Sequence, residues 1–290
     1  MTKGEARAKF AEMVARNECD LELDRAALLI AAEEYPHLDV EKYLDQVGAF
    51  VELARARDDL NAGPLSRIMR LGALLFDELG FRGNVENYFD ARNSFLNDVI
   101  DRRTGIPITL SVLYLEIARR IGLKLFGVGM PGHFIVKFAD DEHEILIDPF
   151  NGGRLLSEEK CREMIEEMYG GEMKFRPAFL YAVTKKQILT RMLQNLKGIY
   201  ARAGDYHKAL EAIERALIIH SGEGSGEGSG EGTDAANEIR DRGLVYSGMG
   251  RYAMAIADLE EYLRLAPQAP DAKEIKERIG QLRQKQARLN

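Results

Sequence analysis

The sequence predicts an α+β protein that is mostly helical, and three observations carry this prediction. Runs of good helix formers fill the first 80 residues and are broken at proline and glycine. Two short segments rich in β-branched and aromatic residues follow, which favours a small antiparallel sheet. From about residue 190, small and aromatic residues recur at a fixed spacing, which is typical of helical repeats. We therefore expect a helical region over 1–80, a mixed core with a trailing helix over 81–185, and a repeat domain over 186–290.

Three amphipathic helices are expected in the first region. Residues 21–34 (LELDRAALLIAAEE) are rich in Ala and Leu and stop before Pro36, because proline disfavours helical geometry in the residue that precedes it. A second helix is expected over 40–57, after Asp39 as its N-cap, and a third over 65–78. We interpret all three as packing helices without chemistry of their own.

A buried helix is expected in the core over residues 105–121 (GIPITLSVLYLEIARRI), because apolar residues lie on nearly every side of it. Pro107 fits its first turn, where the missing N–H costs no hydrogen bond. Gly122 fits the position directly after the helix, where a left-handed backbone is favoured. A further helix is expected over 157–168.

The two strand segments, 133–138 and 144–148, are expected to form a hairpin. If the turn is centred on residues 140 and 141, His133 lies directly opposite Asp148, with their Cβ atoms roughly 4.5–5.5 Å apart. A carboxylate in that place fixes the imidazole tautomer and raises its basicity, as in a catalytic triad. A loop of odd length would separate the two residues. A purely structural polar contact at a strand end is the alternative.

The C-terminal region repeats itself with a constant offset of 46 residues. Tetratricopeptide repeats have a period of about 34 residues, in which small and aromatic positions interlock two antiparallel helices. The excess of 12 matches the low-complexity segment 221–232 (SGEGSGEGSGEG), which we interpret as a flexible insert between two repeats. A last helix over 271–289 would cap the array. The matching positions are Tyr200, Gly204, Tyr206 and Ala209 with Tyr246, Gly250, Tyr252 and Ala255.

Composition excludes several classes of function. The 40 Lys and Arg residues against 47 Asp and Glu give a net charge of −7, which argues against nucleic acid as a direct partner. Cys19 and Cys161 are far apart and lack the spacing of metal ligands, which favours a reducing compartment. No apolar stretch is long enough for a membrane span or a signal peptide. We expect a cytoplasmic protein without cofactor or metal.

Several ordered motifs resemble the SirB family of transglutaminase-like proteins. They are Asn93-Ser94, the run 103–111 (RTGIPITLS), the run 131–134 (PGHF) and the run 147–150 (IDPF). The resemblance covers essentially the whole chain apart from the Gly/Ser/Glu insert. It implies a helical N-terminal part, a transglutaminase-like (papain-like) core and C-terminal tetratricopeptide repeats.

The resemblance also implies a Cys–His–Asp triad, in which His133 and Asp148 match the base and the orienting carboxylate. The nucleophile of such enzymes lies 15 residues before the glycine that ends the helix, and here that position holds Pro107. A cysteine there would gain a low pKa from the helix N-terminus and a nearby imidazolium, whereas proline has no nucleophilic atom. Thr109 and Ser111 are substitutes to consider. Their more common role is helix packing, with the hydroxyl bonded to a carbonyl one turn back.

Other polar residues before the helix could line a cleft near His133, or could satisfy loop carbonyls and carboxylates instead. They are Asn93, Asn97, Arg102 and Arg103. Neither cysteine is placed by the sequence near the start of the 105–121 helix. The candidate site therefore comprises His133 and Asp148, with Asn93, Arg103, Pro107, Thr109 and Ser111 as candidate cleft-lining residues.

The leading functional prediction is an interaction protein that binds a protein or peptide partner in the core cleft and in the groove of its repeats. Family naming associates such proteins with regulation of gene expression, which for this chain would be indirect. The alternative is a hydrolase or acyltransferase that acts on protein or amide substrates. It would use His133, Asp148 and a hydroxyl or water in place of the thiol.

Overall fold

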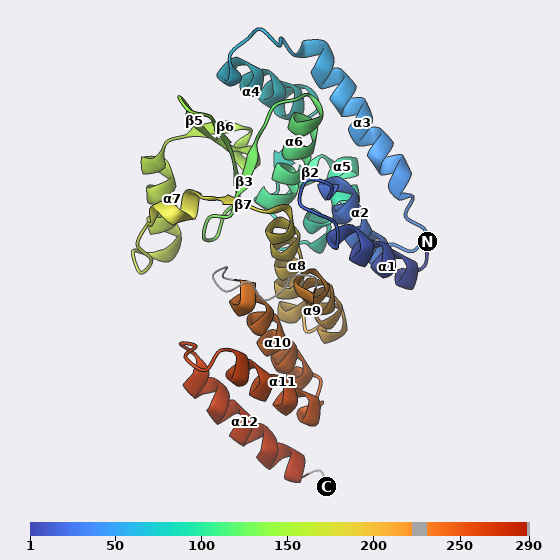
Figure 1. Ribbon diagram of the computed structural model, residues 1–290. Helices are drawn as coiled ribbons and strands as arrows, with labels where there is room; N and C mark the ends of the chain where they lie inside the picture. Colours follow the sequence, from blue (N-terminus) through green and yellow to red (C-terminus); the bar gives the residue numbers. More distant parts are fainter. Residues whose placement is uncertain (222–230, 289–290) are drawn as a thin grey trace. The chain divides into compact units, whose positions relative to one another are not determined.

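The computed structural model describes residues 1–221 and 231–288, and the chain divides into two compact units, Met1–Met192 and Leu193–Asn290. The protein is mostly helical, with a small antiparallel sheet in the first unit (Figure 1). The predicted fold class is thus confirmed. The boundary between the units lies inside one helix, α8 (Lys185–Arg202). Our finer division at residues 80 and 185 stays a prediction.

Helices form the N-terminal part of the first unit, as expected. They are α1 (Lys3–Val14), α2 (Leu23–Glu34), α3 (Val40–Arg57) and α4 (Pro64–Gly72). Asp39 caps α3 by accepting a hydrogen bond from the backbone N–H of Lys42. The predicted helix over 65–78 is α-helical only as far as Gly72 and continues as a π-helix, η1 (Ala73–Glu78).

The buried helix predicted in the core is α6 (Pro107–Arg120), with Pro107 at its first position and Gly122 in the left-handed region at φ 75°. It follows a short 3₁₀ helix, η2 (Ala91–Ser94), and α5 (Leu96–Arg102). Between α5 and α6, β2 (Thr104–Gly105) pairs in parallel with β1 (Arg82–Gly83). The side chains of α6 are buried from Pro107 to Ala118.

A five-stranded antiparallel sheet has the order β6-β5-β4-β3-β7. Its two predicted strands, β4 and β5, lie in the middle, and the sequence analysis missed the three shorter ones. Figure 1 shows the sheet between α6 and α7, and on the α7 side Cys161 packs against Ile135 and Leu146. The strands are β3 (Phe126–Val128), β4 (Ile135–Ala139), β5 (Glu144–Asp148), β6 (Arg154–Leu156) and β7 (Ala182–Val183), and α7 spans Glu158–Tyr169.

The predicted hairpin register is wrong by two residues. Val136 pairs with Ile147 and Phe138 with Ile145, so that the turn is centred on residues 141 and 142. The cause is Asp140, whose carboxylate accepts hydrogen bonds from the backbone N–H groups of Glu142 (2.9 Å) and His143 (2.7 Å). Because the pairing of the two strands is shifted by an even number of residues, every side chain lies on the predicted face of the sheet.

The second unit consists of paired antiparallel helices. The two repeats have equivalent turns, in which Gly204 and Gly250 are left-handed at φ 74° and 73°. The N–H of Asp205 donates to Tyr200 O, and the N–H of Arg251 donates to Tyr246 O, both at 2.9 Å. The helices after α8 are α9 (Tyr206–Ser221), α10 (Glu231–Gly248), α11 (Tyr252–Leu265) and α12 (Ala272–Ala287). Most of the predicted insert, 222–230, lies outside the described residues.

Candidate functional site

His133 and Asp148 are joined by a buried hydrogen bond, 3.0 Å between the imidazole Nε2 and the carboxylate Oδ2. His133 lies two residues before the first residue of β4, and Asp148 is the last residue of β5. The same carboxylate caps the next turn: its Oδ1 accepts from the N–H groups of Phe150 and Asn151. Its Oδ2 accepts from the Asn151 side-chain amide at 2.7 Å. Four donors thus hold this carboxylate in one orientation.

The charge on Asp148 decides which imidazole nitrogen carries the hydrogen. Burial alone would raise the pKa of Asp148, but the hydrogen bonds from His133 and Asn151 outweigh it and leave the pKa below its ordinary value. An ionised carboxylate can only accept, so His133 donates through Nε2–H. In the neutral ring, Nδ1 then carries a lone pair. No group among the described residues is hydrogen-bonded to that atom.

Asn151 is a site residue that the sequence analysis missed. Asn151 lies three residues after Asp148, and Asp148 is the N-cap of the short helical turn between them. At this spacing the side chain of the later residue can turn back and donate to the capping carboxylate. The run Asp148-Pro149-Phe150-Asn151 carries that signal. Asn151 therefore acts as a second positioning group for Asp148, because its side-chain amide donates to Oδ2, the same oxygen that accepts from the imidazole.

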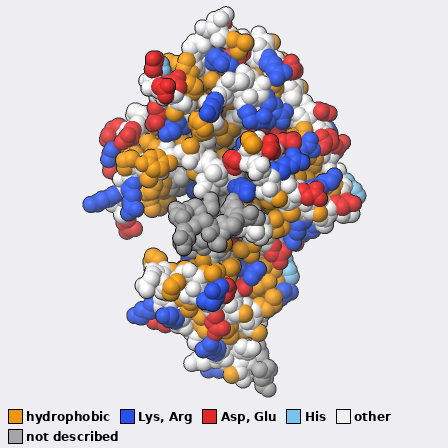
Figure 2. Space-filling model, in the orientation of Figure 1, with side chains coloured by type: hydrophobic (Ala, Val, Ile, Leu, Met, Phe, Trp, Pro, Cys, Tyr) orange, Lys and Arg blue, Asp and Glu red, His pale blue; other side chains and the backbone are white. Residues whose placement is uncertain are grey.

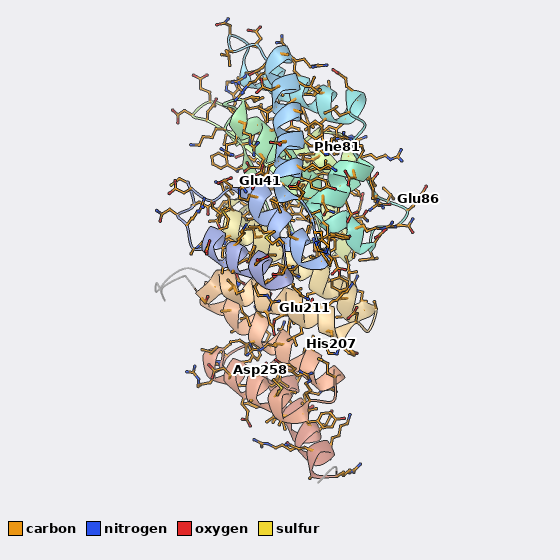
Figure 3. All side chains as sticks on the ribbon, turned by 90° about the vertical axis from the view of Figure 1, so that its right-hand side faces the viewer. Glu41, Phe81, Glu86, His207, Glu211 and Asp258 are labelled. Carbon is orange, nitrogen blue, oxygen red and sulfur yellow. The ribbon has the colours of Figure 1, made fainter. Side chains whose placement is uncertain are left out.

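Aromatic rings connect the pair to the surface of the first unit. The Phe150 ring meets His133 edge-on at 6.0 Å, Tyr88 meets Phe150 at 6.0 Å, and Phe89 meets Tyr88 at 5.3 Å. Phe89 is 60% exposed. Tyr88 and Phe89 belong to the loop over 84–90, and Figure 3 shows Glu86 of this loop at the outer edge of the molecule. The chain of rings forms an apolar path from solvent to the imidazole.

The Met168 side chain of α7 covers Gly132, the residue before His133 in the chain. Gly132 adopts φ 70°, and a Cβ atom there would lie 1.8 Å from the Met168 sulfur. Only glycine therefore permits both the turn before His133 and this close contact. Met168 is itself 49% exposed. Apolar side chains thus contact both the imidazole, through Phe150, and the residue before it, through Met168.

The start of α6 offers no nucleophile in contact with His133. The Thr109 hydroxyl accepts from the backbone N–H of Ile106 at 3.2 Å and lies 2.8 Å from the carbonyl of Asn93 and 3.1 Å from that of Ile106, to which it can donate. Ser111 is fully buried, and its hydroxyl has no hydrogen-bond partner, so the expected bond to a carbonyl one turn back is wrong for this residue. Pro107 occupies the first position of the helix.

The polar residues before α6 are engaged in local structure. Asn93 accepts from the Asn84 amide and donates to the carbonyls of Asn87 and Tyr88, which holds the 84–90 loop in place. Arg102 reaches the Asn93 side chain at 3.4 Å, and the Asn97 carbonyl oxygen is buried without a partner.

Arg103 adopts a left-handed backbone with φ 55°, although it is not a glycine. Its guanidinium lies between the rings of Phe50 and Phe81, 4.6 Å from each centroid. Burial lowers its pKa. This cation joins the core to α3, and we keep a role in the cleft as a proposal for Asn93, Arg103, Pro107, Thr109 and Ser111.

The two cysteines lie in different environments. Cys161 is a fully buried residue of α7, and burial, together with the negative charges of Asp148 and Glu158, raises its pKa to about 11. The Cys161 thiol is therefore protonated near neutral pH and unsuited to attack. Its electrostatic coupling to Asp148 was not foreseen from the sequence. Cys19 is exposed.

Comparison with known proteins identifies the unit Met1–Met192. A family model described as "Transglutaminase-like superfamily" matches residues 41–194, which is more than half of the chain. The chain belongs to the transglutaminase-like superfamily. A second model, described as "Tetratricopeptide repeat", matches residues 196–280. The expected combination of a transglutaminase-like domain with C-terminal repeats is confirmed.

Bacterial relatives of this transglutaminase-like protein match most of its length. It is similar to a UPF0162 protein of Xylella fastidiosa, with 38% identity over 251 residues that cover 85% of each chain. A UPF0162 protein of Vibrio cholerae is 29% identical over 250 residues, which cover 86% of this chain and 85% of the relative. F-box only protein 21 of Homo sapiens is 36% identical over 140 residues, 45% of this chain and 21% of that protein.

The domain combination of the transglutaminase-like protein fits a role in protein interaction, since tetratricopeptide repeats present surfaces suited to protein partners. Across residues 1–221 and 231–288, no helix has the length and apolar character that crossing a membrane requires.

Proposed function

We propose that the chain is a regulatory, cytoplasmic protein of SirB type that binds a protein or peptide partner on a transglutaminase-like core without the catalytic cysteine. The observation that carries the proposal is the contrast between two positions. His133 and Asp148 keep the geometry of a base and its orienter, whereas the first residue of α6 is Pro107. A core that positions an imidazole without a thiol retains recognition chemistry and lacks the covalent step.

The His133 Nδ1 atom supplies the polar contact in this proposal. Its lone pair can accept a backbone N–H from a bound segment, while Asp148 keeps the ring in the required tautomer. The imidazole is only 7% exposed, so that such a bond would be shielded from water. One buried, oriented acceptor fixes the register of a bound chain.

Apolar surface near His133 supplies the rest of the binding energy. Phe150 meets the imidazole edge-on and leads through Tyr88 to the exposed Phe89. The half-exposed Met168 covers Gly132, the residue before His133, and beyond α7 the Tyr181 side chain is 67% exposed. Figure 2 shows hydrophobic side chains gathered over α7 and the segment that follows it. Contiguous exposed apolar surface of this kind marks interaction sites in soluble proteins. The tetratricopeptide unit provides a second binding surface.

The alternative, a hydrolase or acyltransferase that uses activated water, is favoured by one observation. The Nδ1 lone pair is the atom that would take a proton from water, and the Asp148 carboxylate would stabilise the imidazolium that results. Against it, the Thr109 hydroxyl is committed to backbone groups of Ile106 and Asn93. We therefore give binding the preference.

Peptide selection against the full-length protein tests the proposal. Displayed peptides that bind should lose about tenfold or more in affinity with His133→Ala and with Met168→Asp, which places a charge in the apolar border. Met69→Asp is the matched control, because Met69 of α4 is 52% exposed and Met168 is 49% exposed. Peptides that bind the wild type and the three variants with equal affinity would contradict the proposal.

Chemical labelling separates the two functions. Electrophilic probes for serine and cysteine hydrolases should give no adduct that depends on His133. An adduct on Thr109 or Ser111 that disappears in His133→Ala would establish the hydrolase alternative. Labelling of the exposed Cys19 that is unchanged in His133→Ala does not count as catalysis, since it reports accessibility alone.

A further inference from the structure

A cavity of about 780 Å³ lies in the first unit around the C-terminal end of α6. Its walls come from the segment before α2, from α6, from the β3 strand that follows it and from the start of α8. This volume is in the range of small-molecule sites, roughly 300–1,000 Å³. The candidate site residues His133 and Asp148 are not among those that line it.

The lining combines apolar side chains with five charged residues. Its apolar side chains include Leu23, Leu115, Leu123, Leu125, Phe126 and Ile188. Such a wall favours an apolar ligand body, because transfer of that body from water is favourable at roughly 25 cal/mol per Å² of buried apolar area.

The charged groups give the cavity an excess of one positive charge. Glu18 and Glu116 are its acidic residues, and Arg119, Lys124 and Lys185 are its basic ones. Arg119 is ion-paired with Glu116 at 2.7 Å. The Lys185 ammonium donates to the carbonyls of Glu18 (2.9 Å) and Leu21 (2.7 Å).

Lys124 is the cation that remains. Its ammonium lies 5.4 Å from the centre of the Phe126 ring, and no carboxylate among the described residues pairs with it. Among the basic residues of the lining that the structure describes, Lys124 is the one whose ammonium has neither a carboxylate nor a carbonyl partner, so the cavity is complementary to a molecule with an apolar body and one acidic group.

We infer that this cavity binds a small apolar anion of the fatty-acid type, with its aliphatic body against the leucine wall and its carboxylate at Lys124. Cys19 lies in the same lining and is exposed, whereas Cys161 is buried elsewhere in the core. Alkylation of Cys19 therefore reports directly on occupancy of the cavity.

Protection of Cys19 from iodoacetamide, followed by mass spectrometry on the full-length protein, tests the inference with decanoate as the probe. At a decanoate concentration of about ten times Kd, the alkylation rate should fall about tenfold. Decan-1-ol, which has the same chain without the charge, should protect much less. An alkylation rate that decanoate leaves unchanged would overturn the inference.

Two variants assign the effect to the cavity. Lys124→Glu should weaken decanoate binding about fivefold or more, whereas the control Lys276→Glu, an exposed lysine of α12, should leave it unchanged. Leu125→Trp fills the cavity and should abolish protection while leaving Lys124 in place. Equal protection by decan-1-ol and decanoate, or equal affinity in Lys124→Glu and Lys276→Glu, would refute the assignment of the acidic group to Lys124.

Discussion

His133 and Asp148 are hydrogen-bonded at 3.0 Å although they are not partners in the sheet. Extension of the observed register places Ile135 opposite Asp148, and Arg154 is its partner on the other side. The bond therefore runs diagonally, across two residues of the hairpin, on one face of the sheet. Diagonal neighbours are roughly 7–8 Å apart at Cα, which an imidazole and a carboxylate can span.

Asp148→Asn should destabilise the fold by about 1–3 kcal/mol at pH 7, because it disturbs a buried carboxylate with four donors. The folded-state pKa of Asp148 is lowered, so its contribution is present above the unfolded pKa of about 3.9 and is lost as the pH falls through the folded pKa. Urea unfolding at pH 7 and pH 3 measures this. The difference in the free energy of unfolding between the wild type and Asp148→Asn should be smaller at pH 3 than at pH 7. An equal difference at both pH values would contradict the prediction.

Gly132→Ala should cost more than Gly122→Ala. Both glycines have a left-handed backbone, for which an alanine pays about 1–2 kcal/mol. A Cβ at Gly122 meets open space, whereas at Gly132 it meets the Met168 sulfur. Thermal unfolding of both variants, and of Gly132→Ala combined with Met168→Ala, measures the contact. If adding Met168→Ala to Gly132→Ala restores none of the additional loss of stability, the contact with Met168 is not the cause of that loss.

Asp24 should make stability depend on pH around the middle of the acidic range. Burial and the nearby Glu116 raise its pKa to about 6, against the opposing effect of Arg120. The folded state then binds a proton more tightly than the unfolded state, so the wild type should gain stability as the pH falls from 7 towards 4. In Asp24→Asn this gain should be absent. Chemical unfolding between pH 4 and 7 makes the comparison, and parallel curves would show that the pKa of Asp24 is not raised.

Much of the fold and of the candidate site followed from local sequence signals. The α2, α3 and α6 helices were predicted from helix formers, caps and the position of Pro107, which act within one or two turns. The pairing of His133 with Asp148 was also predicted, but from a register that is wrong. Asp140 shifted the turn, and the contact survived because long side chains reach diagonal neighbours.

The remaining features depend on contacts between distant segments. The short strands β3, β6 and β7 have two or three residues each, too few for a periodic pattern. Because α7 packs against the sheet, the Met168 side chain lies against Gly132. For the same reason the charge of Asp148 acts on the pKa of Cys161.

Deletion of residues 221–232 should leave the repeat unit folded, because the deletion restores a spacing of about 34 residues between the repeats. The equivalent turns at Gly204 and Gly250 support this alignment of the repeats. The melting temperature of the shortened protein measures the effect. A fall of more than about 4 °C, on the order of 1 kcal/mol for a domain of this size, would contradict the prediction.

The most direct test of the central claim is to place a thiol at the first position of α6. In a Cys19→Ser background, Pro107→Cys should give a thiol whose alkylation by iodoacetamide at pH 6 is about tenfold faster than in the same protein with His133→Ala. The helix N-terminus and the imidazole would stabilise its thiolate. The buried Cys161, with a pKa of about 11, contributes little. An alkylation rate that is the same with and without His133 would show that Pro107 does not occupy the place of the nucleophile.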